Sequence, residues 1–341
     1  MFTSIALVIV SGVFAFAIAL LVKSNAARLT LVQQANHRSS HVLPTPTGGG
    51  IGMAISVSCC GIALAIGQPH TGMAIAIALS VLIAIIGLLD DLWELPRRVR
   101  LLGHLVFSAI LILTTGDLPV MEPVPSVSIA GPALVILLVF LGAWWINVFN
   151  FMDGIDGLAA SQGVFMAVGA CIIAALVRPE VVDSSLWVWL LCIGAAAAGF
   201  LLLNWPPAKI FMGDAGSTFL GYVVFAVAIL SIKAGWMSYA AWAILAALFI
   251  VDTSTTLIRR MVRRERFLSA HRQHIYQRLS RHYGRHQPVT LLFWGANLVW
   301  VAPLAWLSMR YPAWQWGATL ACYLPLIALA LLLRRVGGDD R

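Results

Sequence analysis

Carboxylates gather where long apolar segments end. The chain has only 14 Asp and Glu among 341 residues. Because a carboxylate close to lipid is costly, one that is found there is usually functional. A single acid such as Glu94, beside Arg97 and Arg98, is simply read as a solvated loop charge. A whole set on one side favours a shared polar site instead, and the set is Asp90, Asp91, Glu94, Asp153, Asp156, Asp214 and Asp252.

Two adjacent aspartates, Asp90 and Asp91, follow the apolar segment 71–89. Neighbouring side chains on a helix diverge by about 100°, so both bind one ion only where the helix frays. We expect one of them to meet a metal ion or the substrate. The other would serve as a base or support its neighbour.

A polar residue recurs every third position through Asn147, Asn150, Asp153 and Asp156. Residues three apart share a helix face, so the pattern predicts a polar stripe that runs out of an apolar helix. Intervening glycines permit tight turns and close approach to a ligand. The simpler alternative is a turn in which Asp156 caps the next helix, but a cap requires one Asp and does not explain the other three residues.

A turn between Asn204 and Ser217 opens another apolar segment and includes Gly213 and Asp214. Free N–H groups at a helix start suit a phosphate. A carboxylate at the same place suits Mg²⁺, which commonly takes one or two carboxylates together with substrate phosphate oxygens. Capping of the helix by Asp214 or Ser217 is the alternative.

A basic loop spans residues 259–289 and contains His271, Arg272 and His274. Its charge is partly that of a cytoplasmic loop in a membrane protein, but these three side chains also suit a diphosphate. Two histidines are too few for a closed zinc site.

Residues 41–50 combine Pro, Thr and Gly and include Thr47 and Gly48. Proline makes this stretch rigid and glycine makes it permissive. It is interpreted as a loop held close to a ligand, or as a simple helix entry.

The elements that must hold these residues are membrane helices. The chain is 60% hydrophobic and 11% charged, with a mean hydropathy of +0.90, which excludes a soluble enzyme. Apolar runs of about 20 residues cross a bilayer as helices. We predict one all-α transmembrane catalytic domain, 1–341, with about eleven spans. The runs are 2–22, 48–67, 71–89, 101–115, 133–151, 158–177, 186–203, 215–231, 236–258, 290–308 and 313–333.

Basic residues predict the orientation of these spans. Lys23 and Arg28 follow the first run rather than precede it, which places the N-terminus in the periplasm. With eleven spans, the C-terminus and all but three of the 22 Lys and Arg then face the cytoplasm, the exceptions being Arg178, Lys233 and Arg310. The net charge of +8 is thus accounted for by cytoplasm and anionic lipid headgroups, and no nucleic acid partner is expected.

The sequence resembles the polyprenyl-phosphate N-acetylhexosamine-1-phosphate transferases, relatives of phospho-MurNAc-pentapeptide translocase. It most resembles the subgroup that initiates O-antigen and related polysaccharides. The resemblance covers most of the chain. It rests on Pro44-Thr-Pro-Thr-Gly-Gly-Gly50, Asp90-Asp91, Asn147 to Leu158, Asn204 to Ser217, Asp252 and the late His loop.

The resemblance implies a reaction in the bacterial inner membrane, with the active site facing the cytoplasm. Undecaprenyl phosphate would attack a UDP-N-acetylhexosamine, giving a lipid-diphosphate-sugar and UMP. Mg²⁺ is the implied cofactor, with Mn²⁺ as a substitute, and a homodimer is left open. By match, Asp214 binds the metal and Asp90 and Asp91 lie near the lipid phosphate, one as base. Asn150, Asp153 and Asp156 contact the nucleotide or order the metal site, and His274 holds phosphate.

This chain departs from the family pattern in two places. The family often has a late His-x-His-His run, but here the stretch reads His274-Ile-Tyr276-Gln277. Many relatives also have Lys just before the Thr-Pro motif, where this chain has Val42 and Leu43.

A lipid phosphate with a second pKa near about 6 is already largely ionised at neutral pH, so a strong base is not required. We favour direct displacement over a covalent Asp–phosphate intermediate. The main rival function is a secondary transporter. Its binding site would be expected near the bilayer midplane between internal repeats, whereas here the carboxylates lie at one face and no repeat is seen.

Overall fold

The computed structural model describes residues 2–33, 45–67, 70–124, 126–265 and 272–333. Within these residues ten helices are long and apolar enough to cross a membrane, and a bent pair of shorter helices makes an eleventh candidate span. The predicted all-α membrane architecture with about eleven spans is therefore confirmed. The predictions for His271 and for residues 34–44 lie outside the described residues.

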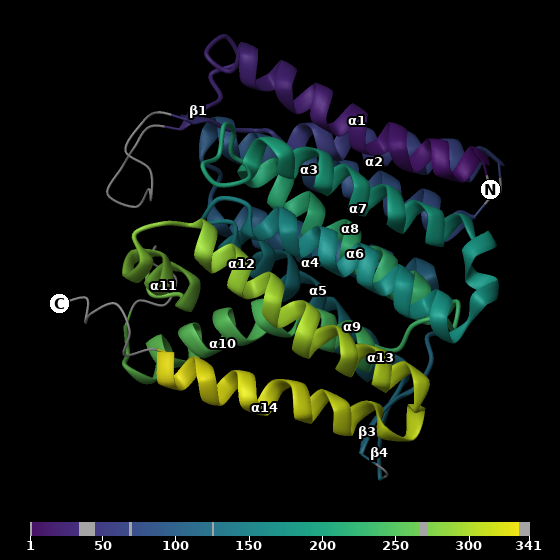
Figure 1. The fold of residues 1–341 in the computed structure, drawn as a ribbon. Coiled ribbons are helices and arrows are strands. Elements are labelled where there is room, and N and C mark those ends of the chain that lie inside the picture. Colours follow the sequence, from purple (N-terminus) through teal and green to yellow (C-terminus); the bar gives the residue numbers. More distant parts are fainter. Residues whose placement is uncertain (1, 34–44, 68–69, 125, 266–271, 334–341) are drawn as a thin grey trace.

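The first half of the chain forms an antiparallel array (Figure 1). Its elements are α1 (Phe2–Asn25), β1 (Val32–Gln33), β2 (Thr45–Pro46), α2 (Gly50–Gly67), α3 (Thr71–Trp93), α4 (Arg97–Thr115), β3 (Met121–Val124), β4 (Val127–Ile129), α5 (Gly131–Met152), α6 (Leu158–Val177), η1 (Pro179–Asp183) and α7 (Ser185–Asn204).

The second half begins with the most buried helix and ends with a long helix on the outside of the bundle. Its elements are α8 (Gly213–Lys233), α9 (Tyr239–Leu245), α10 (Ala247–Val262), α11 (Ile275–Tyr283), α12 (Gln287–Ala296), η2 (Asn297–Val301), α13 (Ala302–Arg310), η3 (Pro312–Trp314) and α14 (Gln315–Leu333).

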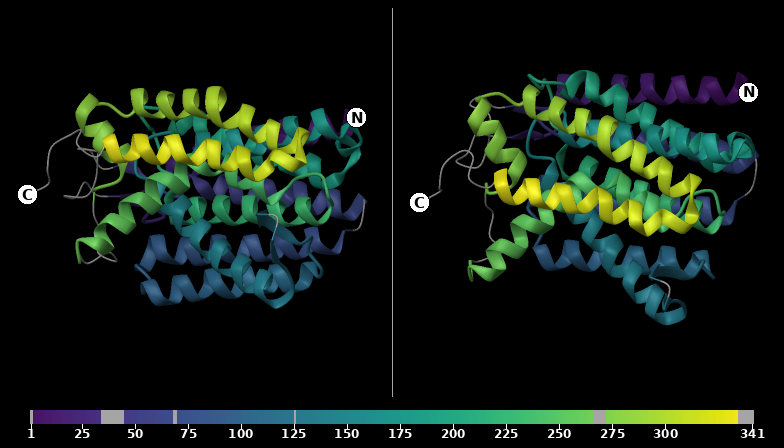
Figure 2. Two further views of the ribbon diagram at one scale, coloured as in Figure 1. Left: turned by 90° about the horizontal axis from the view of Figure 1, so that it is seen from below. Right: turned by 60° about the horizontal axis from the view of Figure 1, so that its bottom comes forward.

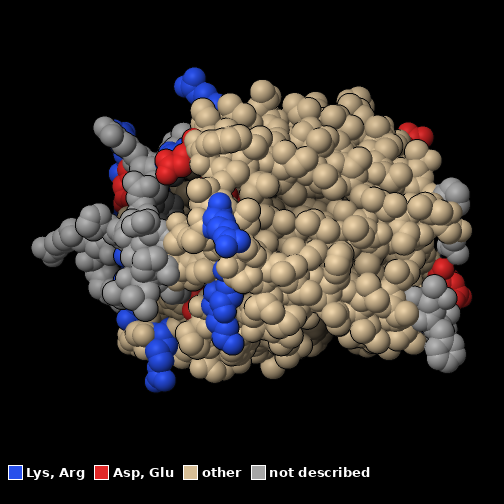
Figure 3. All heavy atoms as spheres, turned by 90° about the horizontal axis from the view of Figure 1, so that it is seen from above, with Lys and Arg blue, Asp and Glu red and all other residues tan. Residues whose placement is uncertain are grey.

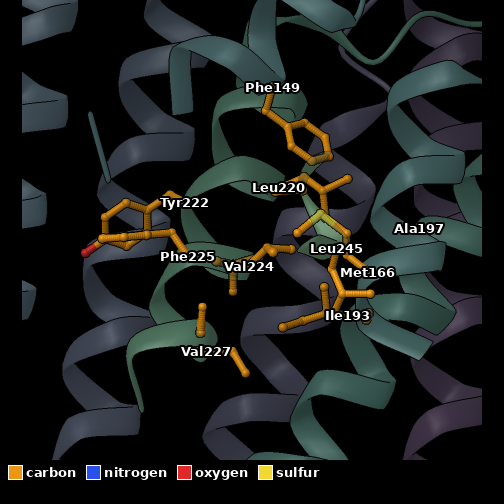
Figure 4. Packing of buried hydrophobic residues seen from close by; sticks show 14 of the residues in the cluster. Phe149, Met166, Ile193, Ala197, Leu220, Tyr222, Val224, Phe225, Val227 and Leu245 are labelled. Atoms are coloured by element: carbon orange, nitrogen blue, oxygen red, sulfur yellow. The ribbon is translucent and has the colours of Figure 1, made fainter. Parts of the chain in front are cut away.

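Helix α8 is the centre of the bundle. It packs against α2, α3 and α5, and Figure 4 shows its Leu220, Tyr222 and Val224 among side chains from neighbouring helices. Its approach to α2 is closest at two glycines: a Cβ added to Gly50 would lie 2.1 Å from the Cα of Gly216. Small residues at such crossings let backbones meet in lipid, where close packing drives helix association. The N-terminus of α8 is thereby fixed in the middle of one end of the molecule.

Charge differs between the two ends of the bundle. On the face shown in Figure 3, Lys and Arg gather toward the end that carries α11, whereas the opposite end shows only acidic groups. Helix α1 begins at one end and α14 finishes at the other (Figure 1), as an odd number of crossings requires. The predicted aspartate-bearing helix ends all lie at the basic end.

The ninth span is not the single helix predicted over 236–258. It is broken into α9 and α10, which meet at an angle of 72°, and α10 leaves the bundle obliquely (Figure 2). Its hydropathy pattern does not reveal the break, because both halves are apolar. A second irregularity follows in the next span, where η2 is a π-helical segment that begins at Asn297.

Candidate active site at the basic end

Four helix ends converge at the basic end and carry most of the predicted site. The C-terminal turns of α3 and α5 meet the first turns of α4 and α8. Asp90 and Asp91 come from α3, Asn150 from α5, and Asp214 and Ser217 from α8. The structure thus brings Asp90, Asp91 and Asp214, which are far apart in sequence, to the same end of the bundle.

Arg100 joins two of these carboxylates. Its guanidinium forms an ion pair with Asp90 and donates a hydrogen bond of 2.9 Å to Asp214 Oδ2. Asp90 is buried, whereas the side chains of Arg100 and Asp214 remain about one third exposed, at 29% and 33%. Since a planar guanidinium presents several donors, one arginine from α4 links the ends of α3 and α8.

Asp91 has a different task from its neighbour, as expected for adjacent residues on a helix. Its carboxylate accepts hydrogen bonds from the backbone N–H groups of Asp214 (2.8 Å) and Ala215 (3.1 Å). It therefore caps α8 from a separate helix. The prediction that these N–H groups are free to bind phosphate is wrong, because Asp91 already occupies them.

Gly213 allows this close approach. Its φ of +75° favours glycine, and an added Cβ would lie 2.7 Å from Asp91 Oδ2. The same Cβ would lie 3.1 Å from both Gly48 N and Thr47 Oγ1. The loop that follows β2 is therefore packed against the start of α8, which supports its interpretation as a loop held beside the site.

Asn150 supports Asp214 from α5. Its amide nitrogen donates to Asp214 Oδ1 (2.7 Å) and to Ser217 Oγ (2.9 Å). One turn earlier, the amide nitrogen of Asn147 donates to Ala143 O and lies 3.1 Å from His104 Nδ1. The predicted stripe is thus helical only for the two asparagines, because α5 ends at Met152.

Asp153 lies in the loop just after α5 and is partly buried. Burial raises the pKa of Asp153 well above its ordinary value, and the negative charges of Asp214, Asp91 and Asp156 raise it further. The four carboxylates therefore act on one another. A bound cation would reduce the repulsion between these carboxylates and favour their charged forms.

Asp156 is held by two segments that follow it at a distance in the sequence. Its carboxylate accepts a hydrogen bond from Ala208 N (3.0 Å) and lies 3.2 Å from His286 Nδ1. It does not cap α6, since Gly157 is the N-cap residue, with φ +73°. The amide of Asn204 brackets this turn, accepting from Gly157 N and donating to Ile210 O, both at 2.9 Å.

His274 and Asp252 form a buried pair. His274 Nδ1 lies 3.2 Å from Asp252 Oδ1. The Asp252 carboxylate also accepts from the backbone N–H groups of Ile275 and Tyr276, each at 2.9 Å. Asp252 thus satisfies the first N–H groups of α11. It attaches α11 to α10, the oblique arm of the broken ninth span.

Tyr276 stands where the family often has a second histidine. Its hydroxyl donates to Phe151 O (2.9 Å), and its ring stacks on His274 with centroids 5.7 Å apart. A Cβ on Gly154 would lie 2.0 Å from the Tyr276 hydroxyl, so only glycine fits there. The tyrosine fastens α11 to the end of α5.

A cavity of about 540 Å³ opens beside Asp156. Its walls come from the turn after α7, from α11 and from the start of α12. It has a strongly basic lining: Arg272, Arg281, Arg285 and His286. Its size is in the range of small-molecule sites.

The described residues include no group of three or more His, Cys, Asp or Glu side chains that could hold a metal ion. Mg²⁺ does not need one, because it usually takes one or two carboxylates and completes its shell with phosphate oxygens and water. Asp214, with Asp153 nearby, offers hard oxygen donors of this kind. The residues therefore fit Mg²⁺ bound together with a phosphorylated substrate.

Two residues of the site were missed at the level of sequence. In the sequence, Arg100 contributes only to the basic residues that predict orientation, and His286 belongs to none of the motifs. A spacing signal does exist for Arg100, which lies one turn into the helix that follows Asp90 and Asp91. For His286 no local signal exists, since it meets Asp156 only through the fold.

The model of the glycosyl transferase family 4 matches residues 73–232. This range runs from α3 to α8 and includes Asp90, Asp91, Asn150, Asp153 and Asp214. A Bacillus subtilis protein named probable undecaprenyl-phosphate N-acetylglucosaminyl 1-phosphate transferase is 32% identical over 76% of this chain and 72% of its own length. The chain belongs to glycosyl transferase family 4.

Other family members match over different extents. Decaprenyl-phosphate N-acetylglucosaminephosphotransferase of Mycolicibacterium smegmatis is 29% identical over 92% of this chain and 84% of its own. A phospho-N-acetylmuramoyl-pentapeptide-transferase of Bacillus thuringiensis is 32% identical over 54% of this chain and 61% of its own length. The resemblance to lipid-linked sugar-phosphate transferases is confirmed at the level of the family, and the transporter alternative has no support.

Proposed function

We propose that this membrane protein transfers an N-acetylhexosamine 1-phosphate from a UDP-sugar to undecaprenyl phosphate, releasing UMP. The observation that carries the proposal is the cluster of Asp90, Asp153 and Asp214 with Arg100 at the basic end of a membrane bundle. The names of the matched relatives support it, since two of them act on polyprenyl phosphates and N-acetylglucosamine. A lipid acceptor and a water-soluble donor require a site at such a boundary.

The donor is proposed to bind in the basic cavity beside Asp156. Arginine guanidinium groups pair well with phosphate oxygens, and three arginines line this cavity. Its volume suits a nucleotide sugar. The loop 153–157 carries Asp156, which lines the cavity, and Asp153, which lies close enough to Asp214 for that charge to raise its pKa. This arrangement would place a diphosphate between the arginines and the carboxylate cluster.

Asp214 and Asp153 are proposed to hold Mg²⁺, with Mn²⁺ as a substitute. The metal, when bound, would neutralise charge on the diphosphate. The protein's own groups have separate tasks. Asn150 orients the Asp214 carboxylate, Asp91 fixes the start of α8, and Arg100 supplies a positive charge between Asp90 and Asp214.

Phosphoryl transfer depends on positioning and charge neutralisation more than on covalent help. We infer that the lipid phosphate attacks directly, since it is ionised at neutral pH. Asp90, which is more buried than the adjacent Asp91, would orient the lipid phosphate through Arg100. We further propose that the site faces the cytoplasm of the bacterial inner membrane, where UDP-sugars are available and where the basic end would lie by the positive-inside rule.

One assay tests the reaction. Purified protein is mixed with undecaprenyl phosphate, Mg²⁺ and each of UDP-N-acetylglucosamine, UDP-N-acetylfucosamine and UDP-N-acetylquinovosamine in turn, and UMP is measured. Turnover is expected with one of these sugars and only when the lipid is present. UMP release that does not depend on the lipid, or no release with any sugar, would overturn the proposal.

Asp214→Asn tests the metal assignment in the same assay. This variant is expected to abolish turnover while its melting temperature stays close to that of the wild type. Asp183→Asn is the matched control, because Asp183 is an exposed acid in η1, outside the site. Full activity of Asp214→Asn would refute the assignment.

A separate proposal concerns the biological pathway that uses the product. The sequence resemblance points to initiation of O-antigen or a related polysaccharide. The matched relatives are named for N-acetylglucosamine or N-acetylmuramoyl-pentapeptide transfer, and none of these names mentions O-antigen. The O-antigen role therefore stays a prediction. The identity of the sugar accepted in the assay would test it.

A further inference from the structure

The break in the ninth span leaves a backbone carbonyl at the end of α9 that needs a partner. Carbonyl groups in the last turn of a helix lack intrahelical donors, and in the interior of a membrane protein they must be satisfied by protein. At Leu245, the last residue of α9, the partner is a side chain: Gln162 Nε2 of α6 donates to Leu245 O at 3.0 Å. An amide from another helix is thus placed directly at the bend.

A second amide holds the first. Asn297 Nδ2 donates to Gln162 Oε1 at 2.7 Å, and both side chains are almost fully buried, with 1% and 2% exposure. Asn297 is also where the π-helical segment begins, and Ala302 N donates to Asn297 O across five residues. Such single-turn π segments are rare and often occur at functional sites. Here the segment lies at the residue that supports the bend.

The bend decides where the oblique arm points. Helix α10 carries Asp252 seven residues after Leu245. The Asp252 carboxylate holds the first N–H groups of α11, and α11 forms one wall of the basic cavity. A change in the direction of α10 would therefore move the wall of the donor cavity, although Gln162 and Asn297 lie outside it.

We propose that Gln162 and Asn297 are positioning residues that set the direction of α10 and, through Asp252, the placement of α11 over the donor site. Neither side chain is among those that line the cavity. The proposal depends on the proposed function for its activity readout only. Its structural readout, the direction of α10, is independent of what reaction the protein performs.

The experiment measures this direction with a pair of spin labels. Cys59, the exposed native cysteine, is first replaced by Ser. Labels are then attached at Val262→Cys, at the end of α10, and Leu102→Cys, on α4. These side chains are 78% and 62% exposed, so labels disturb little packing. The distance distribution between the labels is recorded by pulsed electron spectroscopy in detergent and in nanodiscs.

Three variants are compared on this background. Gln162→Met removes the donor to Leu245 O, and Asn297→Leu removes the donor that holds Gln162. Both keep the side-chain size, and because they lie on different helices, loss of folded protein in one leaves the other informative. Ser56→Ala is the control, since Ser56 is a buried hydrogen-bonding residue that donates to Ser11 O between α2 and α1, away from the bend.

Gln162→Met and Asn297→Leu are each expected to shift or broaden the distance distribution and to lower kcat/KM at least tenfold. Because the two amides act in series, the double variant should have a kcat/KM no lower than that of the less active single variant. Ser56→Ala should leave both readouts unchanged. An unchanged distribution in both single variants, or an equal shift in Ser56→Ala, would overturn the proposal. Wild-type protein with no turnover on any UDP-sugar would refute the proposed function alone, and the label distances would still decide this inference.

Discussion

Replacement of Arg100 is the most direct test of how charge is arranged in the site. Arg100 contacts Asp90 and Asp214 from α4. Arg100→Ala leaves both carboxylates without this positive charge, beside the site that we propose binds a diphosphate. We expect a large loss of activity with a smaller loss of stability, because the three helices that meet here are also held together by extensive apolar packing.

The magnitude follows from burial. Truncating one partner of a well-buried charge pair costs about 2–5 kcal/mol, but Arg100 and Asp214 are 29% and 33% exposed, and solvent weakens such a pair. We therefore take the lower part of the range, about 2–3 kcal/mol. At about 1.4 kcal/mol for each tenfold change in rate, this corresponds to a fall of roughly 30- to 150-fold in kcat/KM.

The assay is UMP release with saturating lipid and varied UDP-sugar, with melting temperature measured in parallel. Arg100→Lys should recover only part of the activity, because an ammonium group cannot present the planar fork that reaches two carboxylates. Arg98→Ala is the control, since Arg98 is an exposed arginine in the same turn of α4. Arg100→Ala activity within threefold of the wild type would refute the reasoning.

Further predictions concern the loop 153–157 and α11. Burial and the charges of Asp214, Asp91 and Asp156 raise the pKa of Asp153 above its ordinary 3.8. The folded protein therefore binds this proton more tightly than the unfolded chain, and ionisation costs the folded state more as pH rises. Without Mg²⁺, the melting temperature of Asp153→Asn should exceed that of the wild type at pH 8 but not at pH 4. The variant should also lose turnover. A melting temperature below that of the wild type at pH 8 would contradict this prediction. Asp252→Asn should weaken the N-terminal attachment of α11, seen as faster hydrogen exchange in α11 and not in α6. His286→Ala should raise the KM for UDP-sugar several-fold with little change in kcat; an effect on kcat alone would exclude a role in donor binding.

Much of this protein could be predicted from sequence because a bilayer leaves few structural choices. Apolar runs of 20 residues in lipid must be helices, so ten of the eleven spans were recovered as continuous segments. The side on which the aspartates gather followed from the same counting, since residues at alternate helix ends share a side of the membrane. Asp214 at the start of a helix also led to the expectation of a hard oxygen donor for a cation, and this stays a prediction.

Tertiary structure alone decided which partner each of these groups meets. Asp90 and Asp91 are adjacent in sequence, yet one pairs with Arg100 and the other caps α8, because a helix directs neighbouring side chains apart. The pairing of Asp156 with His286 joins residues 130 positions apart and has no local pattern. The break at Leu245 was invisible for a related reason: hydropathy reports whether a residue prefers lipid, whereas a bend depends on which side chain satisfies the freed carbonyl. That side chain, Gln162, comes from a helix more than 80 residues away.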